Sequence, residues 1–152
     1  MNFFLVRHGE AKPEYEDPKR PLSDRGRRDA ERMARALHER KVAVAEILHS
    51  GKLRAKQTAE IMTRFLSPGR GVREITGLAP EDDPVLAKAE LEAADAPLML
   101  VGHLPHLGRL AALLVTGDGE RSVVEFPPAA VVCLSRMDGG WKVEWSLTPD
   151  AI

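Results

Sequence analysis

The sequence has one cysteine, few aromatic side chains and almost no net charge. Cys133 cannot form an internal disulfide, and its place in the apolar run AVVCLS indicates a small buried side chain rather than a reactive thiol. Aromatic residues make up 5% of the chain, and the formal net charge is -1 although 30% of the residues are charged. Because positive and negative side chains balance, the composition favours neither nucleic acid nor an acidic membrane as a partner.

Long hydrophobic runs are also absent, and none approaches the roughly 20 residues of a membrane-spanning helix. The apolar start FFLV is shorter than the core of a signal peptide and continues into Arg7, His8 and Gly9 rather than into a cleavage site. We therefore expect a cytoplasmic protein with no membrane association. Its 152 residues, 43% of them hydrophobic, suit one globular domain over residues 1–152.

Short apolar runs and amphipathic segments alternate along most of the chain. The apolar runs predict strands, and apolar residues that recur every three or four positions predict helices. Local signals mark the helix ends: Ser23 or Asp24 as an N-cap, Asp83 before Pro84, and Gly117 beyond a last turn. Strands are expected at residues 3–6, 44–50, 72–75 and 97–103, and helices at 24–40, 52–66, from 84 onward and from 105 to 116.

The C-terminal part differs, because two β-rich runs follow each other without a helix. AAVVCLSRM and WKVEWSL are joined by Asp138, Gly139 and Gly140, a strong signal for a β-hairpin. Trp141 and Trp145 are an even number of positions apart in the second run, so we expect them on one face. The whole pattern predicts a three-layer α/β/α fold with a mostly parallel sheet and an antiparallel hairpin near the C-terminus.

Four basic side chains stand where predicted strands end or a predicted helix begins. Arg7 and His8 follow the first strand, Arg54 lies in the first turn of the second helix, and His103 follows the strand over residues 98–101. Open α/β sheets bind ligands at the carboxyl ends of their strands, so these side chains are expected to converge. Guanidinium groups bind phosphate oxygens, and an imidazole can act as a nucleophile or proton carrier. The residues therefore indicate an anion pocket with a reactive imidazole.

Three stretches in this order resemble the motifs of the histidine phosphatase superfamily, the phosphoglycerate-mutase-like enzymes. LVRHGEA resembles the Arg-His-Gly signature, SGKLRAKQTAE the Ser-Pro-Leu-x-Arg-Ala-x-Gln-Thr-Ala block, and LMLVGHLPHLGRL the second-histidine block. The short chain, KRPLSDRG and GHLP further resemble the SixA-type phosphohistidine phosphatases over nearly the whole sequence. Gly51 and Lys52 depart from the family, which usually has proline and an apolar or aromatic residue there.

The resemblance implies a phosphatase that needs no metal ion and no cofactor. His8 would attack phosphorus and become phosphorylated, and water would then hydrolyse the phosphohistidine. Arg7, Arg54 and His103 would hold the phosphoryl oxygens, which agrees with the need of phosphoryl transfer for fixed positive donors and an in-line nucleophile. A hydrogen bond from the other ring nitrogen of His8 to a backbone carbonyl would fix its tautomer. Gly9 would let the backbone approach the phosphate.

The expected substrate is phosphohistidine on a signalling protein, for example on a histidine phosphotransfer domain. Larger members of the family carry a glutamate acid after the third strand, whereas here no residue can be assigned to that role. Alkoxide leaving groups benefit from a proton donor, but an imidazole is readily protonated near neutral pH. The lack of an assignable acid therefore favours a substrate in which a P–N bond is cleaved. Arg20, in KRPLS, resembles a pocket residue of the SixA-type enzymes and is expected as an auxiliary phosphate or substrate contact. The unassigned acid candidates are Glu74, Glu81, Asp82 and Asp83.

Three other functions stay open. A small-molecule phosphomonoesterase would use the same core, and a non-catalytic phosphate-binding module would keep the arginines without needing His8 as a nucleophile. A metal-dependent hydrolase could use His8, His49, His103 and His106, but adjacent arginines disfavour a bound cation and no carboxylate motif supports the histidines. We expect His49 to end the second strand and His106 to lie in an exposed first turn. The sequence does not predict the oligomeric state.

Overall fold

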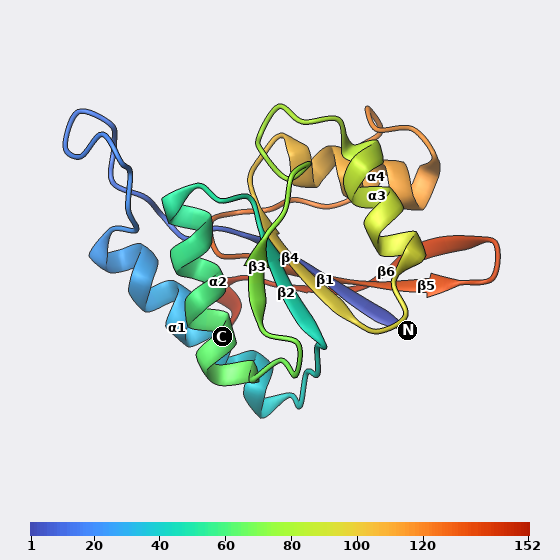
Figure 1. The fold of residues 1–152 in the computed structure, drawn as a ribbon, viewed down its shortest axis with the longest axis horizontal. Helices are drawn as coiled ribbons and strands as arrows, with labels where there is room; N and C mark the ends of the chain where they lie inside the picture. Colours follow the sequence, from blue (N-terminus) through green and yellow to red (C-terminus); the bar gives the residue numbers. More distant parts are fainter.

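A six-stranded sheet forms the centre of the molecule, and the computed structural model describes residues 1–152 (Figure 1). The strands lie in the order β3-β2-β4-β1-β5-β6. The first four pair in parallel and the last two join antiparallel, which confirms the predicted mostly parallel sheet and its C-terminal hairpin. The strands are β1 (Asn2–Arg7), β2 (Glu46–His49), β3 (Val72–Glu74), β4 (Leu98–Gly102), β5 (Val131–Met137) and β6 (Gly140–Leu147).

Two helices cover each face of the sheet, which confirms the predicted three layers (Figure 1). α1 and α2 pack together on one face, and α3 and α4 on the other. No helix combines the length and the hydrophobicity needed to cross a membrane. The helices are α1 (Asp24–Glu39), α2 (Leu53–Leu66), α3 (Pro84–Ala93) and α4 (His106–Thr116), and a short 3-10 helix, η1 (Pro149–Ala151), follows β6.

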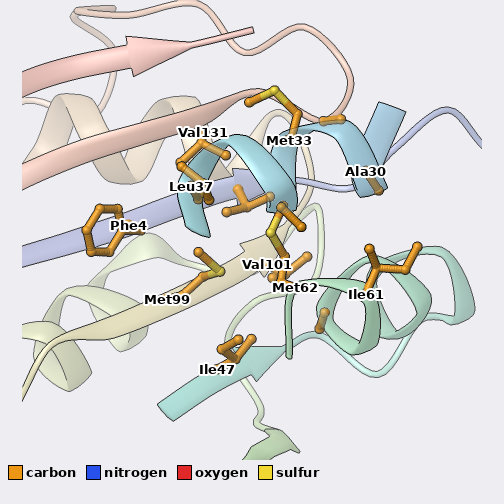
Figure 2. Close-up of a cluster of buried hydrophobic side chains, with 14 of the residues drawn as sticks. Phe4, Ala30, Met33, Leu37, Ile47, Ile61, Met62, Met99, Val101 and Val131 are labelled. Atoms are coloured by element: carbon orange, nitrogen blue, oxygen red, sulfur yellow. The ribbon is translucent and has the colours of Figure 1, made fainter. Parts of the chain in front are cut away.

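The face under α1 and α2 is filled by methionines and branched side chains (Figure 2). Met33 of α1, Met62 of α2 and Met99 of β4 are fully buried in one cluster with Phe4 and Val101. A second buried cluster lies on the other face, under α3 and α4. Successive strand residues point to opposite faces, so a sheet covered on both faces needs continuous apolar strands. This is why the apolar runs of the sequence located β1, β2 and β4.

The predicted helix ends agree with the structure. The Ser23 side chain caps α1 by accepting the backbone N–H of Gly26 at 3.0 Å. The Asp83 side chain caps α3 directly before Pro84. α4 ends at Gly117, whose φ of 80° lies in the left-handed region that glycine adopts without a steric penalty.

The two tryptophans lie on opposite faces of the hairpin, so the expectation that they share one face is wrong. Trp141 packs on Phe3, with ring centroids 5.3 Å apart, and Trp145 packs on Phe4, at 6.0 Å. Phe3 and Phe4 are neighbours on β1 and therefore point to opposite faces. The register between β5 and β6 shifts next to Cys133, and one extra residue on a strand inverts the alternation beyond it. Even spacing in the sequence does not show such a bulge.

Three parallel strands end at the same edge of the sheet, and each is followed by a predicted site residue. β4 lies between β1 and β2. His8 follows β1, His103 follows β4, and Arg54 lies in the first turn of α2, which follows β2. The sheet order therefore places the three segments side by side.

Candidate active site

His8 is held by the backbone at the end of β1. Its Nδ1 lies 2.6 Å from the carbonyl oxygen of Gly9. A carbonyl can only accept, so Nδ1 carries the ring proton and Nε2 keeps a free lone pair. The backbone N–H of His8 donates to Gly102 at 3.0 Å, and its carbonyl accepts from Ala129 at 3.1 Å. The fold thus fixes both the position of this ring and the nitrogen that can act as a nucleophile.

His103 faces His8 across the site. The two ring centroids are 5.0 Å apart, and the ring planes are inclined by 55°. Nε2 of His103 lies 2.6 Å from Oγ of Ser50, the residue after β2, and its Nδ1 is buried without a hydrogen-bond partner. Ser50 was not among the predicted site residues, although it opens the block SGKLRAKQTAE.

Arg7 and Arg54 bring two cations to this edge without a carboxylate partner. Nη1 of Arg7 donates to the carbonyl of Phe126 at 2.8 Å, and the Nε atoms of both arginines are buried without a partner. Neither residue forms an ion pair. Burial lowers the pKa of both guanidinium groups, and the charge of Arg20 lowers that of Arg54 further. Guanidinium stays protonated in proteins, so the site carries positive charge that an anion can compensate.

Both histidines of the site are uncharged at neutral pH. Burial is the main cause that lowers the pKa of His8 to about 4, and three nearby guanidinium groups act in the same direction. Burial also lowers the pKa of His103 to about 3, with the neighbouring His8 as the next cause. The three guanidinium groups belong to Arg54, Arg7 and Arg20. The structure therefore brings Arg7, His8, Arg54 and His103 together.

The segment after His8 is clamped between α1 and α2. The N–H of Gly9 donates to Oγ1 of Thr58 at 3.1 Å, and this fully buried hydroxyl donates to the carbonyl of Arg54 at 2.8 Å. A Cβ on Gly9 would lie 2.7 Å from the carbonyl oxygen of Gly26 in α1. Helix packing is thus a reason for glycine here that the sequence did not show, and the contact of Gly9 with phosphate stays a prediction. Thr58, which was also not predicted as a site residue, links the segment after His8 to the helix that carries Arg54.

Arg20 belongs to the segment between β1 and α1, which includes a projecting loop (Figure 1). Its Nε donates to the carbonyl of Lys12 at 3.1 Å, and its φ of 48° lies in the left-handed region. The charge of Arg20 lowers the pKa of both His8 and Arg54, so the guanidinium group lies close to the site. Its role as a substrate contact stays a prediction.

None of the four acid candidates is among the charges that shift the pKa of His8 or His103. The carboxylates of Asp82 and Asp83 each accept a backbone N–H, at 2.9 and 3.0 Å. Glu81 is exposed. Glu74 is also exposed, but its carboxylate occupies the space that a Cβ on Gly51 would need, next to the loop that carries Ser50.

Two further histidines do not join the site. His49 ends β2, as predicted, and its Nδ1 accepts the N–H of Gly51 at 3.0 Å. His106 is fully buried at the start of α4, so the expectation of an exposed first turn is wrong. Burial lowers its pKa, while the charges of Asp82 and Asp83 act in the opposite direction, because the segment before α3 lies over this turn. In the whole chain, no group of three or more histidine, cysteine or acidic side chains is arranged to hold a metal ion.

Comparison with known proteins identifies the family. The model of the histidine phosphatase superfamily (branch 1) matches residues 3–78, a segment that contains Arg7, His8 and Arg54. The phosphohistidine phosphatase SixA of Escherichia coli (strain K12) is 30% identical over 155 residues, which cover 98% of this chain and 94% of that protein. The chain belongs to the histidine phosphatase superfamily.

Solved structures of phosphatases share this fold. The protein histidine phosphatase SixA in complex with tungstate superposes with a TM-score of 0.88 at 29% identity, covering 99% of this chain and 98% of that one. A mycobacterial glucosyl-3-phosphoglycerate phosphatase in complex with VO3 superposes with a TM-score of 0.69 at 18% identity, covering 95% and 97% of the two chains. The second likeness shows only that the fold is the same.

The buried neutral histidines make stability depend on pH. An unfolded imidazole binds a proton near its ordinary pKa of about 6.5, whereas folded His8 and His103 bind one only near pH 4 and 3. Between these values the unfolded chain holds more protons, so stability falls as pH is lowered from about 7 to about 4. We expect a loss of about 1 to 2 kcal/mol per imidazole between pH 7 and pH 5, measured by urea unfolding.

His103→Asn should make this pH dependence shallower, because asparagine does not titrate in this range. His38→Asn, at an exposed position of α1, is the matched control and should leave the slope unchanged. Equal slopes in the parent and in His103→Asn would contradict a neutral, buried His103.

Proposed function

We propose that the protein is a phosphohistidine phosphatase that acts through a covalent phosphohistidine on His8. The observation that carries the proposal is the free Nε2 of His8 in a site where two half-buried arginines lack a carboxylate partner. A phosphoryl group in transfer spreads negative charge over its equatorial oxygens, which such donors stabilise. The 30% identity to a phosphohistidine phosphatase over nearly the full length of both chains supports the same activity.

The first step transfers the phosphoryl group to the protein. Nε2 of His8 attacks phosphorus, and a new P–N bond forms while the P–N bond to the substrate imidazole breaks. Arg7, Arg54 and His103 donate to the three oxygens, and the departing imidazole takes up a proton from solvent. In the second step, water attacks phosphorus, and a P–O bond forms while the P–N bond to His8 breaks. The attacking water gives a proton to solvent, so phosphate leaves and neutral His8 is restored. The positive charge comes from side chains, so neither step needs a metal ion or a cofactor.

The acid candidates favour phosphohistidine over a phosphate ester as substrate. The carboxylates of Asp82 and Asp83 accept backbone N–H bonds from Ala79 and Val85, and Glu81 is exposed. A phosphorylated imidazole leaves readily near neutral pH without a positioned acid, whereas an alkoxide does not. The partner we propose is therefore a protein that carries phosphohistidine, such as a histidine phosphotransfer domain.

The second candidate is a small-molecule phosphomonoesterase of the same superfamily, and the position of Glu74 beside the loop of Ser50 favours it. Glu74→Gln separates the two. Phosphohistidine hydrolysis should be unchanged in this variant, whereas hydrolysis of an alkyl phosphate that uses Glu74 as its acid would be lost. A binding module without activity would retain phosphate in the parent and in Glu74→Gln and would turn over neither substrate.

The covalent intermediate is directly testable. We expect the protein, mixed with a phosphorylated histidine phosphotransfer domain in chelator, to take up an acid-labile and alkali-stable phosphoryl label. His8→Asn should abolish the label, and Arg54→Ala should slow its formation about 100-fold or more, since it removes a donor to the charge of the transition state. His38→Asn is the control for the loss of a histidine. A label that survives in His8→Asn would show that the nucleophile is another residue.

The proposed substrate contact of Arg20 is tested by comparing the removal of its side chain with the removal of a neighbouring lysine side chain. Arg20→Ala should lower kcat/KM for the phosphoprotein about tenfold, because a charge-assisted contact is lost. Lys19→Ala removes the same charge from an exposed position of the same loop and should have little effect. Equal losses in the two variants would mean that net charge, rather than a specific contact, is responsible.

A further inference from the structure

Ser50 is the one polar partner of the His103 ring. The two are joined by the 2.6 Å contact between Oγ of Ser50 and Nε2 of His103, while Nδ1 of His103 is buried and has no partner. His103 is 2% exposed, so water does not substitute for a missing partner around most of the ring. Whatever selects the protonated nitrogen of this neutral ring must therefore act through Ser50.

The burial of Nδ1 decides between the two neutral tautomers. A proton on Nδ1 would leave a buried N–H without an acceptor, and orphaned buried donors are rarer than unpaired acceptors. A proton on Nε2 instead donates to Ser50, and only a lone pair stays unpaired at Nδ1. The hydroxyl oxygen also receives the backbone N–H of Lys52 at 3.3 Å, which holds it in place at the start of α2. The arrangement favours the Nε2–H tautomer.

The two histidines of the site thus need opposite tautomers, and different neighbours set them. The carbonyl of Gly9 accepts from Nδ1 of His8, which leaves the lone pair on Nε2 for attack on phosphorus. His103 must instead present a hydrogen on Nε2, since a neutral ring can donate to a phosphoryl oxygen only from a protonated nitrogen. The Gly9 carbonyl therefore keeps Nε2 of His8 free as a nucleophile, and the Ser50 hydroxyl keeps Nε2 of His103 protonated as a donor. The centroids of the two rings are 5.0 Å apart.

We propose that Ser50 is a positioning residue that holds His103 as the Nε2–H tautomer until a phosphoryl oxygen arrives and accepts that hydrogen. No covalent bond changes in this step. The hydrogen bond from Nε2–H of His103 passes from the serine oxygen to the phosphoryl oxygen. The serine hydroxyl continues to accept the backbone N–H of Lys52. The kinetic part of this role rests on the proposed function, whereas the tautomer is a property of the resting protein and can be measured without substrate.

The first test is nitrogen NMR of the resting protein with 15N-labelled histidine, at neutral pH. In the parent, we expect Nε2 of His103 to give a protonated-type signal and Nε2 of His8 an unprotonated-type signal. Ser50→Ala should shift the His103 signals toward the other tautomer and leave those of His8 in place. Ser50→Thr keeps a hydroxyl and should restore the parent pattern, and Ser146→Ala, at an exposed position of β6, is the matched control.

The second test is steady-state turnover of the phosphorylated histidine phosphotransfer domain. Loss of one hydrogen bond that fixes the donor should lower kcat about tenfold in Ser50→Ala while KM changes less than about threefold, with recovery in Ser50→Thr. Thermal unfolding checks that each variant is folded. An Nδ1–H tautomer of His103 in the parent, or an unchanged Nε2–H signal in Ser50→Ala, would overturn the inference. The spectra decide this even if phosphohistidine is not the substrate.

Discussion

Two guanidinium groups held at the carboxyl edge of the sheet without carboxylate partners are the feature on which the rest of the site depends. The Nε atoms of Arg7 and Arg54 are buried and unpaired, and removing positive charge from water without a counter-charge opposes folding. The fold tolerates this cost because two buried clusters on the faces of the sheet fix the surrounding backbone. A phosphoryl group bound between the two arginines would compensate this charge, which favours a dianion as the ligand.

The same positive charges also prepare the nucleophile. Burial and the neighbouring guanidinium groups keep His8 uncharged, with its pKa at about 4, while the hydrogen bond to Gly9 holds the proton on Nδ1. A protonated His8 could not attack phosphorus. The guanidinium groups that would bind the anion thus add to the effect of burial in keeping His8 uncharged, and the order of β1, β4 and β2 brings the required segments to one edge.

The sequence predicted much of this arrangement, for physical reasons that differ from part to part. Strands covered on both faces must be apolar throughout, so β1, β2 and β4 could be located from their composition. Polar residues at the ends of such strands have no packing role, which made His8 and His103 stand out. The place of Arg54 in the first turn of the following helix joined it to them, and the resemblance to a known family then gave the group a common chemistry.

What the sequence did not predict depends on contacts between distant segments. The faces of Trp141 and Trp145 follow from a register shift between β5 and β6, and the burial of His106 follows from the segment before α3. Neither the register shift nor this burial produces a recognisable local pattern in the sequence. The packing of Gly9 against α1 and the contact of Ser50 with His103 likewise join residues from different elements, although all of them lie in or next to recognised motifs.

The central claim is that Arg7, His8, Arg54 and His103 form a single oxyanion site, and calorimetric titration with tungstate in chelator tests it most directly. Tungstate stays a dianion near neutral pH, so its own protonation does not obscure the result. We predict one site per chain, with affinity reduced about tenfold or more in Arg54→Ala and unchanged in Arg64→Ala, which removes an exposed arginine from the same helix. Equal affinity in the parent and in Arg54→Ala would contradict the account.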